Sequence, residues 1–248
     1  MTKTNLSRLI SPKSIAVVGN RGADFAIRES QKLGFTGKIW AIHPTRDSIE
    51  GIDCYRDIRD LPEAPDATFI AVNAESAIDI VADLKSIGAG GAVLYASGFG
   101  ELGEAGVIRN QRLIKAADGM PLIGPNCYGF INSLDGVALW PDVQGCEVIK
   151  KGVAIITQSG NIGLNMTMQS VGLPIAYMFT LGNQTNTNIS DIIHSMLDDD
   201  RVNAIGLHVE GINDIEMFDD AARRALRKKI PIVAIKSGRT VSSAQIAL

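Results

Sequence analysis

Short apolar runs recur along the chain, and each one ends in a small or polar residue before a segment whose apolar positions have helical spacing. Runs of this length that are rich in Val and Ile are typical of strands buried on both faces. The runs are "SIAVVGN", "KIWAIHP", "ATFIAVN", "GAVLYASG", "PLIGPN", "GVAIITQSG", "IAYMFTLGN", "AIGLHVEG" and "PIVAIKSG". Between them, the spacing predicts helices over residues 23–33, 76–87, 105–117, 162–171, 189–197 and 215–228.

This alternation predicts an α/β protein with parallel sheets and right-handed crossovers. The runs divide after the fifth, where "LDGVALWPDVQGCEVIKKG" carries turn residues and no clear period. We therefore place a domain boundary near Gly145, with a Rossmann-like domain over residues 1–145 and a flavodoxin-like domain over residues 146–248. One continuous large sheet is the alternative.

Composition narrows the class of protein. Of the 248 residues, 46% are hydrophobic and the net charge is −3, which excludes a disordered chain and argues against a general nucleic-acid surface. Three cysteines without paired spacing favour a reducing compartment and argue against a metal site. The first residues lack an apolar signal segment and no run is long enough to span a bilayer, so we expect a cytoplasmic protein.

Ligands of open α/β sheets bind at the carboxyl ends of the strands, so the turns after the runs are the candidate sites. The first turn, "VVGNRGADF", has glycines at Gly19 and Gly22, but Asn20 and Arg21 interrupt the G-x-G-x-x-G spacing. Two interpretations remain: an anion site at a helix N-terminus, with Arg21 neutralising a phosphate, or a glycine turn without a ligand.

The turns around the second and fifth apolar runs give weaker evidence of a ligand site. No acidic residue ends the second strand, which argues against NAD, and Lys38 before that strand is either a phosphate contact or an ordinary surface lysine. In "LIGPNCYGFIN", Asn126 can reach across its turn and Cys127 lies where a helix is expected to start. A nucleophilic cysteine needs a base, and no histidine is close in sequence, so a packed thiol is favoured.

The stretch "GVAIITQSGNIG" places Ser159 between a strand and a helix. A serine nucleophile elbow reads G-x-S-x-G, and the glycine two residues before Ser159 is missing. We therefore favour an anion cradle made by the helix N-terminus and the serine hydroxyl. Glu210 ends an apolar strand, where a carboxylate is costly unless it is paired or functional.

In sequence order, "LIGPNCYGFIN", "TQSGNIG", "FTLGNQTNTNISDII", "VEGI" and "AIKSGRT" resemble the motifs of NDP-forming acyl-CoA synthetases, and they are similar to the α subunit of succinyl-CoA synthetase. The resemblance covers almost the whole chain. It implies a CoA-binding domain followed by a ligase domain, and the reaction acid + CoA + ATP ⇌ acyl-CoA + ADP + phosphate. It also implies an acyl phosphate, a phosphohistidine, and ATP or ADP with Mg²⁺ on a separate ATP-grasp domain or subunit.

The resemblance also carries residue roles. Glu210 matches a glutamate that holds the active-site histidine, and the turns after "GPNC" and "TQSG" match two helix N-termini that face a phosphoryl group. The cofactor-binding matches are Gly19, Asn20, Arg21, Lys38, Pro44, Val72, Asn73, Ser97, Gly98, Asn126, Cys127, Ser159 and Gly160.

One departure is large. In the family, a Ser-His-Thr-Gly loop follows the strand that matches "PIVAIKSG", and its histidine carries the phosphate, whereas this sequence stops at "SSAQIAL". His43, His194 and His208 do not match that position. The chain is thus either a fragment of a longer, oligomeric synthetase or a natural short protein that senses CoA or acyl-CoA without catalysis. An NAD-dependent oxidoreductase is the third and disfavoured reading.

Overall fold

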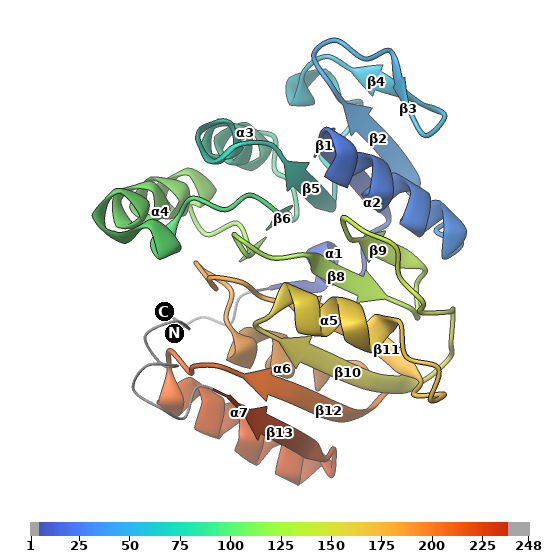
Figure 1. The fold of residues 1–248 in the computed structure, drawn as a ribbon, viewed down its shortest axis with the longest axis vertical. Helices are drawn as coiled ribbons and strands as arrows, with labels where there is room; N and C mark the ends of the chain where they lie inside the picture. Colours follow the sequence, from blue (N-terminus) through green and yellow to red (C-terminus); the bar gives the residue numbers. More distant parts are fainter. Residues whose placement is uncertain (1–4, 238–248) are drawn as a thin grey trace.

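The chain forms two mixed, mostly parallel sheets with helices on their faces, in a computed structural model that describes residues 5–237 (Figure 1). The first sheet has the order β3-β4-β2-β1-β5-β6-β7. Its strands are β1 (Ser14–Gly19), β2 (Lys38–Ile42), β3 (Ser48–Ile49), β4 (Ile52–Tyr55), β5 (Ala67–Ala71), β6 (Ala92–Leu94) and β7 (Leu122–Ile123). Its helices are α1 (Ser7–Ile10), α2 (Arg21–Lys32), α3 (Ala74–Ser86) and α4 (Gly103–Ala117), with short 3₁₀ turns at Ile58–Asp60 and Gly100–Leu102.

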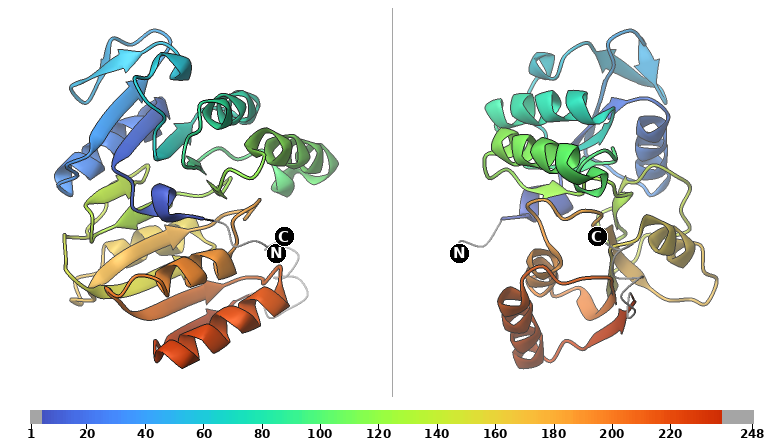
Figure 2. Two further views of the ribbon diagram at one scale, coloured as in Figure 1. Left: turned by 180° about the vertical axis from the view of Figure 1, so that it is seen from behind. Right: turned by 60° about the vertical axis from the view of Figure 1, so that its left-hand side comes forward.

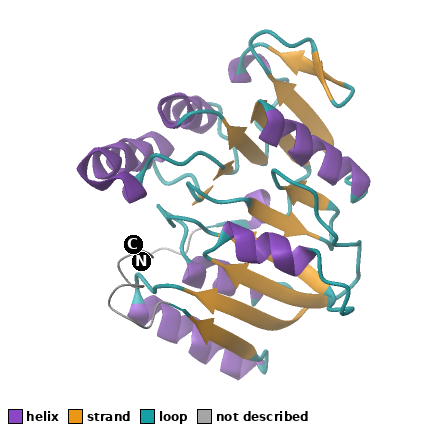
Figure 3. Cartoon of the chain, viewed as in Figure 1, coloured by secondary structure: helices purple, strands orange, loops and turns teal. Residues whose placement is uncertain are grey.

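The second sheet has the order β13-β12-β10-β11-β8-β9. Its strands are β8 (Gly129–Asn132), β9 (Val137–Leu139), β10 (Gly152–Thr157), β11 (Ile175–Thr180), β12 (Val202–Val209) and β13 (Ile232–Lys236). Helix α5 (Gly160–Thr167) packs on one face, and α6 (Ile189–Met196) and α7 (Ile215–Lys228) pack on the other (Figure 3). Within residues 5–237, no helix is both long enough and apolar enough to cross a bilayer.

The predicted α/β class is confirmed, and each of the nine apolar runs contains a strand. The alternative of one continuous sheet is wrong, because the strands form two separate hydrogen-bonded sheets. The sheets are also not purely parallel, since β3 pairs antiparallel with β4 and β8 pairs antiparallel with β11 and β9. Strands β8 and β9 precede Gly145 yet belong to the second sheet, so a domain boundary at that residue stays a prediction.

The first sheet is buried on both sides, as the unbroken apolar runs require. In β1, Ile15 and Val17 contact the cluster that includes α1 and α2, whereas Ala16 and Val18 contact the cluster that includes α3 and α4. Successive side chains of a strand point to opposite faces, so a strand covered twice needs apolar residues at every position.

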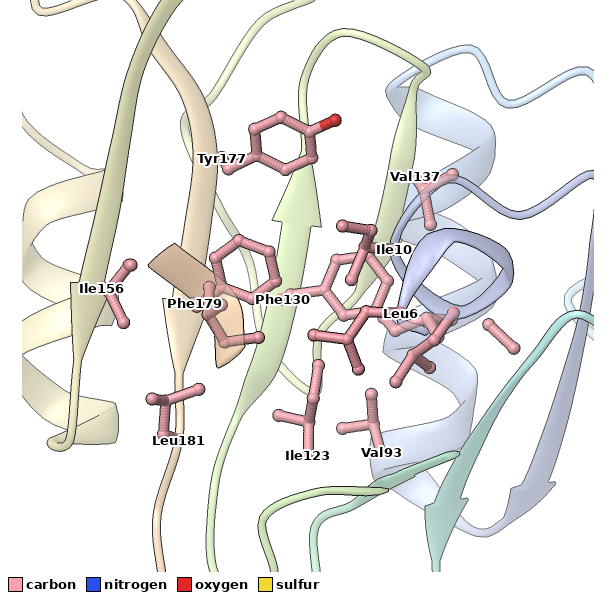
Figure 4. Close-up of a cluster of buried hydrophobic side chains, with 14 of the residues drawn as sticks. Leu6, Ile10, Val93, Ile123, Phe130, Val137, Ile156, Tyr177, Phe179 and Leu181 are labelled. Carbon is pink, nitrogen blue, oxygen red and sulfur yellow. The ribbon is translucent and has the colours of Figure 1, made fainter. Parts of the chain in front are cut away.

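One hydrophobic core joins the two sheets. Ile10 of α1, its N-cap residue Leu6 and Val93 of β6 belong to the same buried cluster as Phe130 of β8 and Phe179 of β11 (Figure 4). Helix α1 lies between the sheets, and its Ile10 carbonyl accepts a 2.8 Å hydrogen bond from the Asn132 side chain (Figure 2). The two halves of the chain are therefore packed as one body.

Helix α2 closes the edge of the second sheet at β9. The Ser30 hydroxyl donates to the Ala138 carbonyl and accepts from the Ala138 amide, both at 3.0 Å. Ser30 is fully buried. A side chain of the first half thus takes the place that a further strand would have at this edge.

Candidate functional site

The turns that follow strands β5, β6, β10 and β12, together with the segment after β7, meet around one pocket of about 800 Å³ between the two sheets. Such a position at the carboxyl ends of parallel strands is the expected ligand site of an open α/β sheet. The structure brings eight of the predicted site residues into this central pocket: Val72, Asn73, Ser97, Asn126, Cys127, Ser159, Gly160 and Glu210.

Ser159 is the N-cap of α5. Its Oγ accepts a hydrogen bond from the Ile162 amide at 3.4 Å, and its own amide donates to Thr157 Oγ1 at 3.0 Å. Because the hydroxyl is an acceptor in the cap, its proton remains available to a ligand. The first-turn amides of Gly160 and Asn161 lack intrahelical acceptors, and both residues line the same pocket. This geometry is that of an anion cradle.

A nucleophilic Ser159 lacks a base in this geometry. All three histidines lie within the described residues, and none of them hydrogen-bonds Ser159 Oγ. His208 lies on β12, the neighbour of β10 in the sheet, and its Nδ1 is 3.1 Å from Thr157 Oγ1 rather than bonded to Ser159.

The prediction that a helix starts after "GPNC" is wrong. Residues 129–132 form β8, which pairs antiparallel with β11, so Asn126 and Cys127 belong to a turn and not to a helix N-terminus. The reason is tertiary: Phe130 and Ile131 bury their side chains on the two faces of the second sheet. The cradle in the described residues therefore rests on α5.

Cys127 lines the pocket, but the residue is buried and belongs to the hydrophobic core. The thiol donates weak hydrogen bonds to the Leu94 and Ile123 carbonyls, at 3.5 and 3.6 Å. Burial raises the pKa of Cys127 to about 12. A thiol that stays protonated at neutral pH is a poor nucleophile, in agreement with the packed-thiol interpretation.

Gln158 holds Glu210 in place, and the sequence reasoning missed it. Its Oε1 accepts hydrogen bonds from the amides of Glu210 and Gly211, and its Nε2 donates to the Gly211 carbonyl at 2.7 Å. Lys236 adds a hydrogen bond to the Glu210 carbonyl at 2.7 Å. The signal was the unusual glutamine directly after the apolar run of "GVAIITQSG".

Two tyrosines that line the central pocket were also missed. Tyr95 follows β6 and Tyr128 precedes β8. Their rings make an edge contact, with centroids 6.0 Å apart and an interplanar angle of 70°. In the sequence they are hidden, because Tyr95 reads as part of an apolar run and Tyr128 as part of a turn.

A second pocket, of about 390 Å³, lies at the carboxyl ends of β1, β2 and β5. It is lined by four predicted residues, Gly19, Asn20, Pro44 and Val72, and by His43. Val72 also lines the central pocket, so the two pockets are neighbours.

His43 organises this second pocket. Its Nδ1 accepts hydrogen bonds from the amides of Thr45 and Arg46 at 3.2 and 3.0 Å, which leaves Nε2 to donate to Asn20 Oδ1 at 3.1 Å. The ring therefore orients the Asn20 side chain at the start of α2.

The backbone geometry explains why residue 19 is a glycine. Its φ is +123°, and a Cβ at this position would lie 2.3 Å from the Ala71 carbonyl oxygen. The glycine is thus required by the close approach of β1 and β5.

Three predicted residues are not brought into either pocket. Lys38 begins β2 at the opposite end of the sheet and pairs with Glu63 at 2.9 Å. Arg21 is exposed at the first position of α2. Gly98 follows Ser97, and its carbonyl accepts a 2.9 Å hydrogen bond from Arg109. Among the described residues, no group of His, Cys, Asp and Glu is arranged to hold a metal ion.

Comparisons with known proteins agree with this geometry. Residues 13–133 match the family model of a CoA binding domain, and residues 150–248 match that of a succinyl-CoA ligase-like flavodoxin domain. The chain is 32% identical over 95% of its length to a trans-feruloyl-CoA synthase from an unknown prokaryotic organism. It is 28% identical over 98% of its length to the α subunit of an ADP-forming acetate–CoA ligase II of Pyrococcus furiosus.

A solved structure is similar as well. The dinucleotide-forming acetyl-coenzyme A synthetase 1 of Candidatus Korarchaeum cryptofilum, in complex with phosphate and ADP, matches 98% of the chain with a TM-score of 0.88 and 30% identity. The chain spans 35% of the first of these relatives and 54% of each of the other two. Together the fold, the matched domains and these relatives show that the chain belongs to the ADP-forming acyl-CoA synthetase family, of which it carries the CoA-binding domain and the succinyl-CoA ligase-like flavodoxin domain.

Proposed function

We propose that this chain supplies the CoA-binding and phosphate-binding parts of an acyl-CoA synthetase that catalyses acid + CoA + ATP ⇌ acyl-CoA + ADP + phosphate. The observation that carries the proposal is the central pocket, where turns of the CoA-binding half meet the N-terminus of α5. A thiol that reaches the pocket from the first half would meet an acyl phosphate held by the second half.

In this proposal the second pocket takes the nucleotide end of CoA, and the pantetheine arm passes Val72 toward Asn73 and Ser97. Because Val72 lines both pockets, the pantetheine arm has a continuous route from one pocket to the other. Asn126, in the turn after β7, lies where the thiol enters the central pocket.

The cradle of Ser159, Gly160 and Asn161 holds the phosphoryl group. In the forward direction a carboxylate oxygen of the acid bonds to phosphorus, and the phosphoryl donor leaves. The CoA thiolate then attacks the acyl carbon, and phosphate leaves with the electron pair of the broken carbon–oxygen bond. Developing negative charge on the phosphoryl oxygens is stabilised by the α5 amides and the Ser159 hydroxyl.

Glu210 lines the same pocket as the cradle, and Gln158 Oε1 accepts a hydrogen bond from its backbone amide. We assign to it the family role of holding the histidine that carries the phosphoryl group. That histidine and the ATP-grasp partner, with ATP or ADP and Mg²⁺, come from outside the described residues. The α-subunit relative supports association with such a partner.

The experiment is calorimetric titration of the chain with CoA, with NAD as the comparison ligand. We expect CoA to release heat on binding, and we expect this heat to disappear when a CoA analogue that keeps the adenosine diphosphate group competes for the site. NAD should give no binding heat. An absence of CoA binding, or tighter binding of NAD, would falsify the proposal.

A CoA-sensing module without catalysis is the second candidate. The observation that favours it is that His43, His194 and His208 are each held by other residues of the chain. Phosphoryl transfer to the chain from labelled ATP and an ATP-grasp partner separates the two candidates, since a sensing module binds CoA without accepting phosphate.

A further inference from the structure

The central pocket has an aromatic wall. The Tyr95 side chain is 40% exposed although its neighbours in β6 are buried, and the Tyr128 ring meets it edge to face. Exposure of a large ring inside a pocket is unusual, because burial of a tyrosine ring is favourable unless a ligand covers it. Neither tyrosine hydroxyl hydrogen-bonds a described residue.

Buried rings from both halves fix the wall. Phe69 of β5 stacks on Tyr95 with centroids 6.2 Å apart, and Trp140 contacts Tyr128 edge to face at 5.3 Å. Phe69 and Trp140 are fully buried. The two tyrosine rings are therefore positioned by core packing before any ligand arrives, and little ordering entropy remains to be lost on binding.

The wall adjoins the anion cradle. A Cβ on Gly160 would lie 2.8 Å from Cδ1 of Tyr128, so this ring rests against the first residue of α5. The carbon chain of an acid whose carboxylate meets the phosphoryl group at Ser159 must leave the cradle beside this ring.

We propose that Tyr95 and Tyr128 form the acyl subsite of the central pocket and that the subsite takes carboxylic acids that carry an aromatic ring. The inference rests on the function proposed above and names its substrate class. An aromatic ring can pack against the open side of this wall, in edge-to-face or offset contact with a tyrosine ring, which a saturated ring of equal size cannot make. Burial, the charge of Tyr95 and that of Asp142 all raise the pKa of Tyr128, so its hydroxyl stays protonated and can donate to a polar ring substituent.

The test compares 3-phenylpropionate with 3-cyclohexylpropionate, two acids of equal length, by calorimetric or saturation-transfer titration of the full 248-residue chain in the presence of phosphate. A simple apolar pocket favours the cyclohexyl acid, because it buries more hydrocarbon. We expect the phenyl acid to bind about threefold to tenfold more tightly. Equal or tighter binding of the cyclohexyl acid, or no binding of either acid, overturns the inference.

Variants locate the subsite. Tyr95→Leu and Tyr128→Leu should abolish the preference for the phenyl acid while CoA affinity stays within twofold, roughly the scatter of such titrations. Tyr95→Phe should keep the preference, and Tyr55→Leu, in β4 outside both pockets, is the matched control. If the leucine variants weaken CoA and leave the acids unchanged, the rings line the pantetheine route and the inference is wrong. Loss of CoA binding in the wild-type chain would instead count against the proposed function.

Discussion

At the scale of single residues, Ser159 has two roles that can be separated. As N-cap it stabilises α5, and as a hydroxyl donor it contacts the anion. Ser159→Ala should lose about 0.5–2 kcal/mol of folding free energy from the cap. It should also lose about 1.5–3 kcal/mol of phosphate or sulfate affinity from a hydrogen bond to a charged partner.

Ser159→Asp separates these roles, because aspartate caps a helix well but repels an anion. We expect near wild-type stability in urea and little phosphate binding by calorimetry. Asp214→Ala, which removes the N-cap of α7 away from the pocket, is the control for lost stability alone. Unchanged anion affinity in both Ser159 variants would mean that the serine only caps its helix.

Ser30 gives a second prediction at this scale. Ser30→Ala leaves the Ala138 amide and carbonyl without their partner in a fully buried place. Leaving such groups unsatisfied costs about 1–3 kcal/mol, which urea unfolding measures. Ser86→Ala, on the exposed end of α3, is the comparison and should change stability little. A Ser30 variant as stable as the Ser86 variant would show that water replaces the hydroxyl.

Sequence reasoning located Ser159 and Asn73 at strand ends, and in the structure they cap the helices that follow β10 and β5, while their roles toward a ligand stay predictions. It could not place Lys38, because a lysine before a strand lies at the opposite edge of a parallel sheet from the turns that bind ligands. It also missed Gln158, since a contact between the ends of β10 and β12 depends on strand order.

At the scale of elements, one ionic cluster ties the β8–β9 hairpin to β11 and to the turn before β12. Arg201 pairs with Asp135 at 2.7 Å and with Asp199 at 2.8 Å, and the Tyr177 hydroxyl donates to Asp199 at 2.8 Å. Burial is the largest single influence and would raise the pKa of Asp135 and of Asp199. The hydrogen bonds and charge of Arg201, together with hydrogen bonds from Asn132 to Asp135 and from Tyr177 to Asp199, outweigh it, so both pKa values are lowered.

This cluster predicts a loss of stability in acid. A carboxyl whose pKa is lowered by folding stabilises the protein above its unfolded pKa of about 3.9, and the contribution disappears as the pH falls through the lowered value. We therefore expect Arg201→Met to be less stable than wild type at pH 7 and the difference to shrink below about pH 4. Urea unfolding at several pH values tests this.

Arg223→Met is the control for Arg201→Met, because its pair with Asp219 is exposed and lies within one helix. A difference between Arg201→Met and wild type that stays constant from pH 7 to pH 3 would contradict the role given to the two carboxylates.

The elements themselves were predictable where apolar runs are long. Strands β8 and β9 were not, because each has at most four residues and follows a glycine-rich or turn-rich stretch that local spacing cannot distinguish from a loop. The pairing of β8 with β11, and of β9 with β8, is set by the core that Phe130 and Val137 enter. The prediction of a helix after "GPNC" was wrong for the same reason.

At the scale of the whole molecule, the three histidines lead to a prediction about phosphorylation. His43 is held by Asn20, and His194 is buried against Arg224. His208 contacts Thr157 within the sheet. We expect no acid-labile, base-stable phosphoryl adduct on this chain when it is incubated with labelled ATP and an ATP-grasp partner, and no acyl-CoA synthesis.

The Pyrococcus furiosus α subunit with its own partner is the positive control for acyl-CoA synthesis in that incubation. An adduct on this chain that disappears in His208→Ala would refute the prediction, and would make His208 the phosphoryl carrier.

The shared core predicts cooperative unfolding. Because α1, β6, β8 and β11 contribute to one buried cluster, neither half keeps its core when the other unfolds. Differential scanning calorimetry should show a single transition with equal calorimetric and van't Hoff enthalpies. Two resolved transitions, or near-ultraviolet and far-ultraviolet dichroism that melt at different temperatures, would contradict a common core.

The insertion of β8 and β9 into the second sheet, with α2 closing its edge, also governs how the pocket can change during evolution. A cleft between hinged lobes can adapt to a longer or shorter substrate by closing less or more, but here the two sheets share a buried core, and Ser30 of α2 hydrogen-bonds Ala138 of β9. The width of the pocket is therefore inherited with the fold. With the acyl subsite proposed above, a lineage of such chains would acquire a new acid by exchanging the side chains at positions 95 and 128. The substrates of relatives should therefore be recorded against the residues at those two positions.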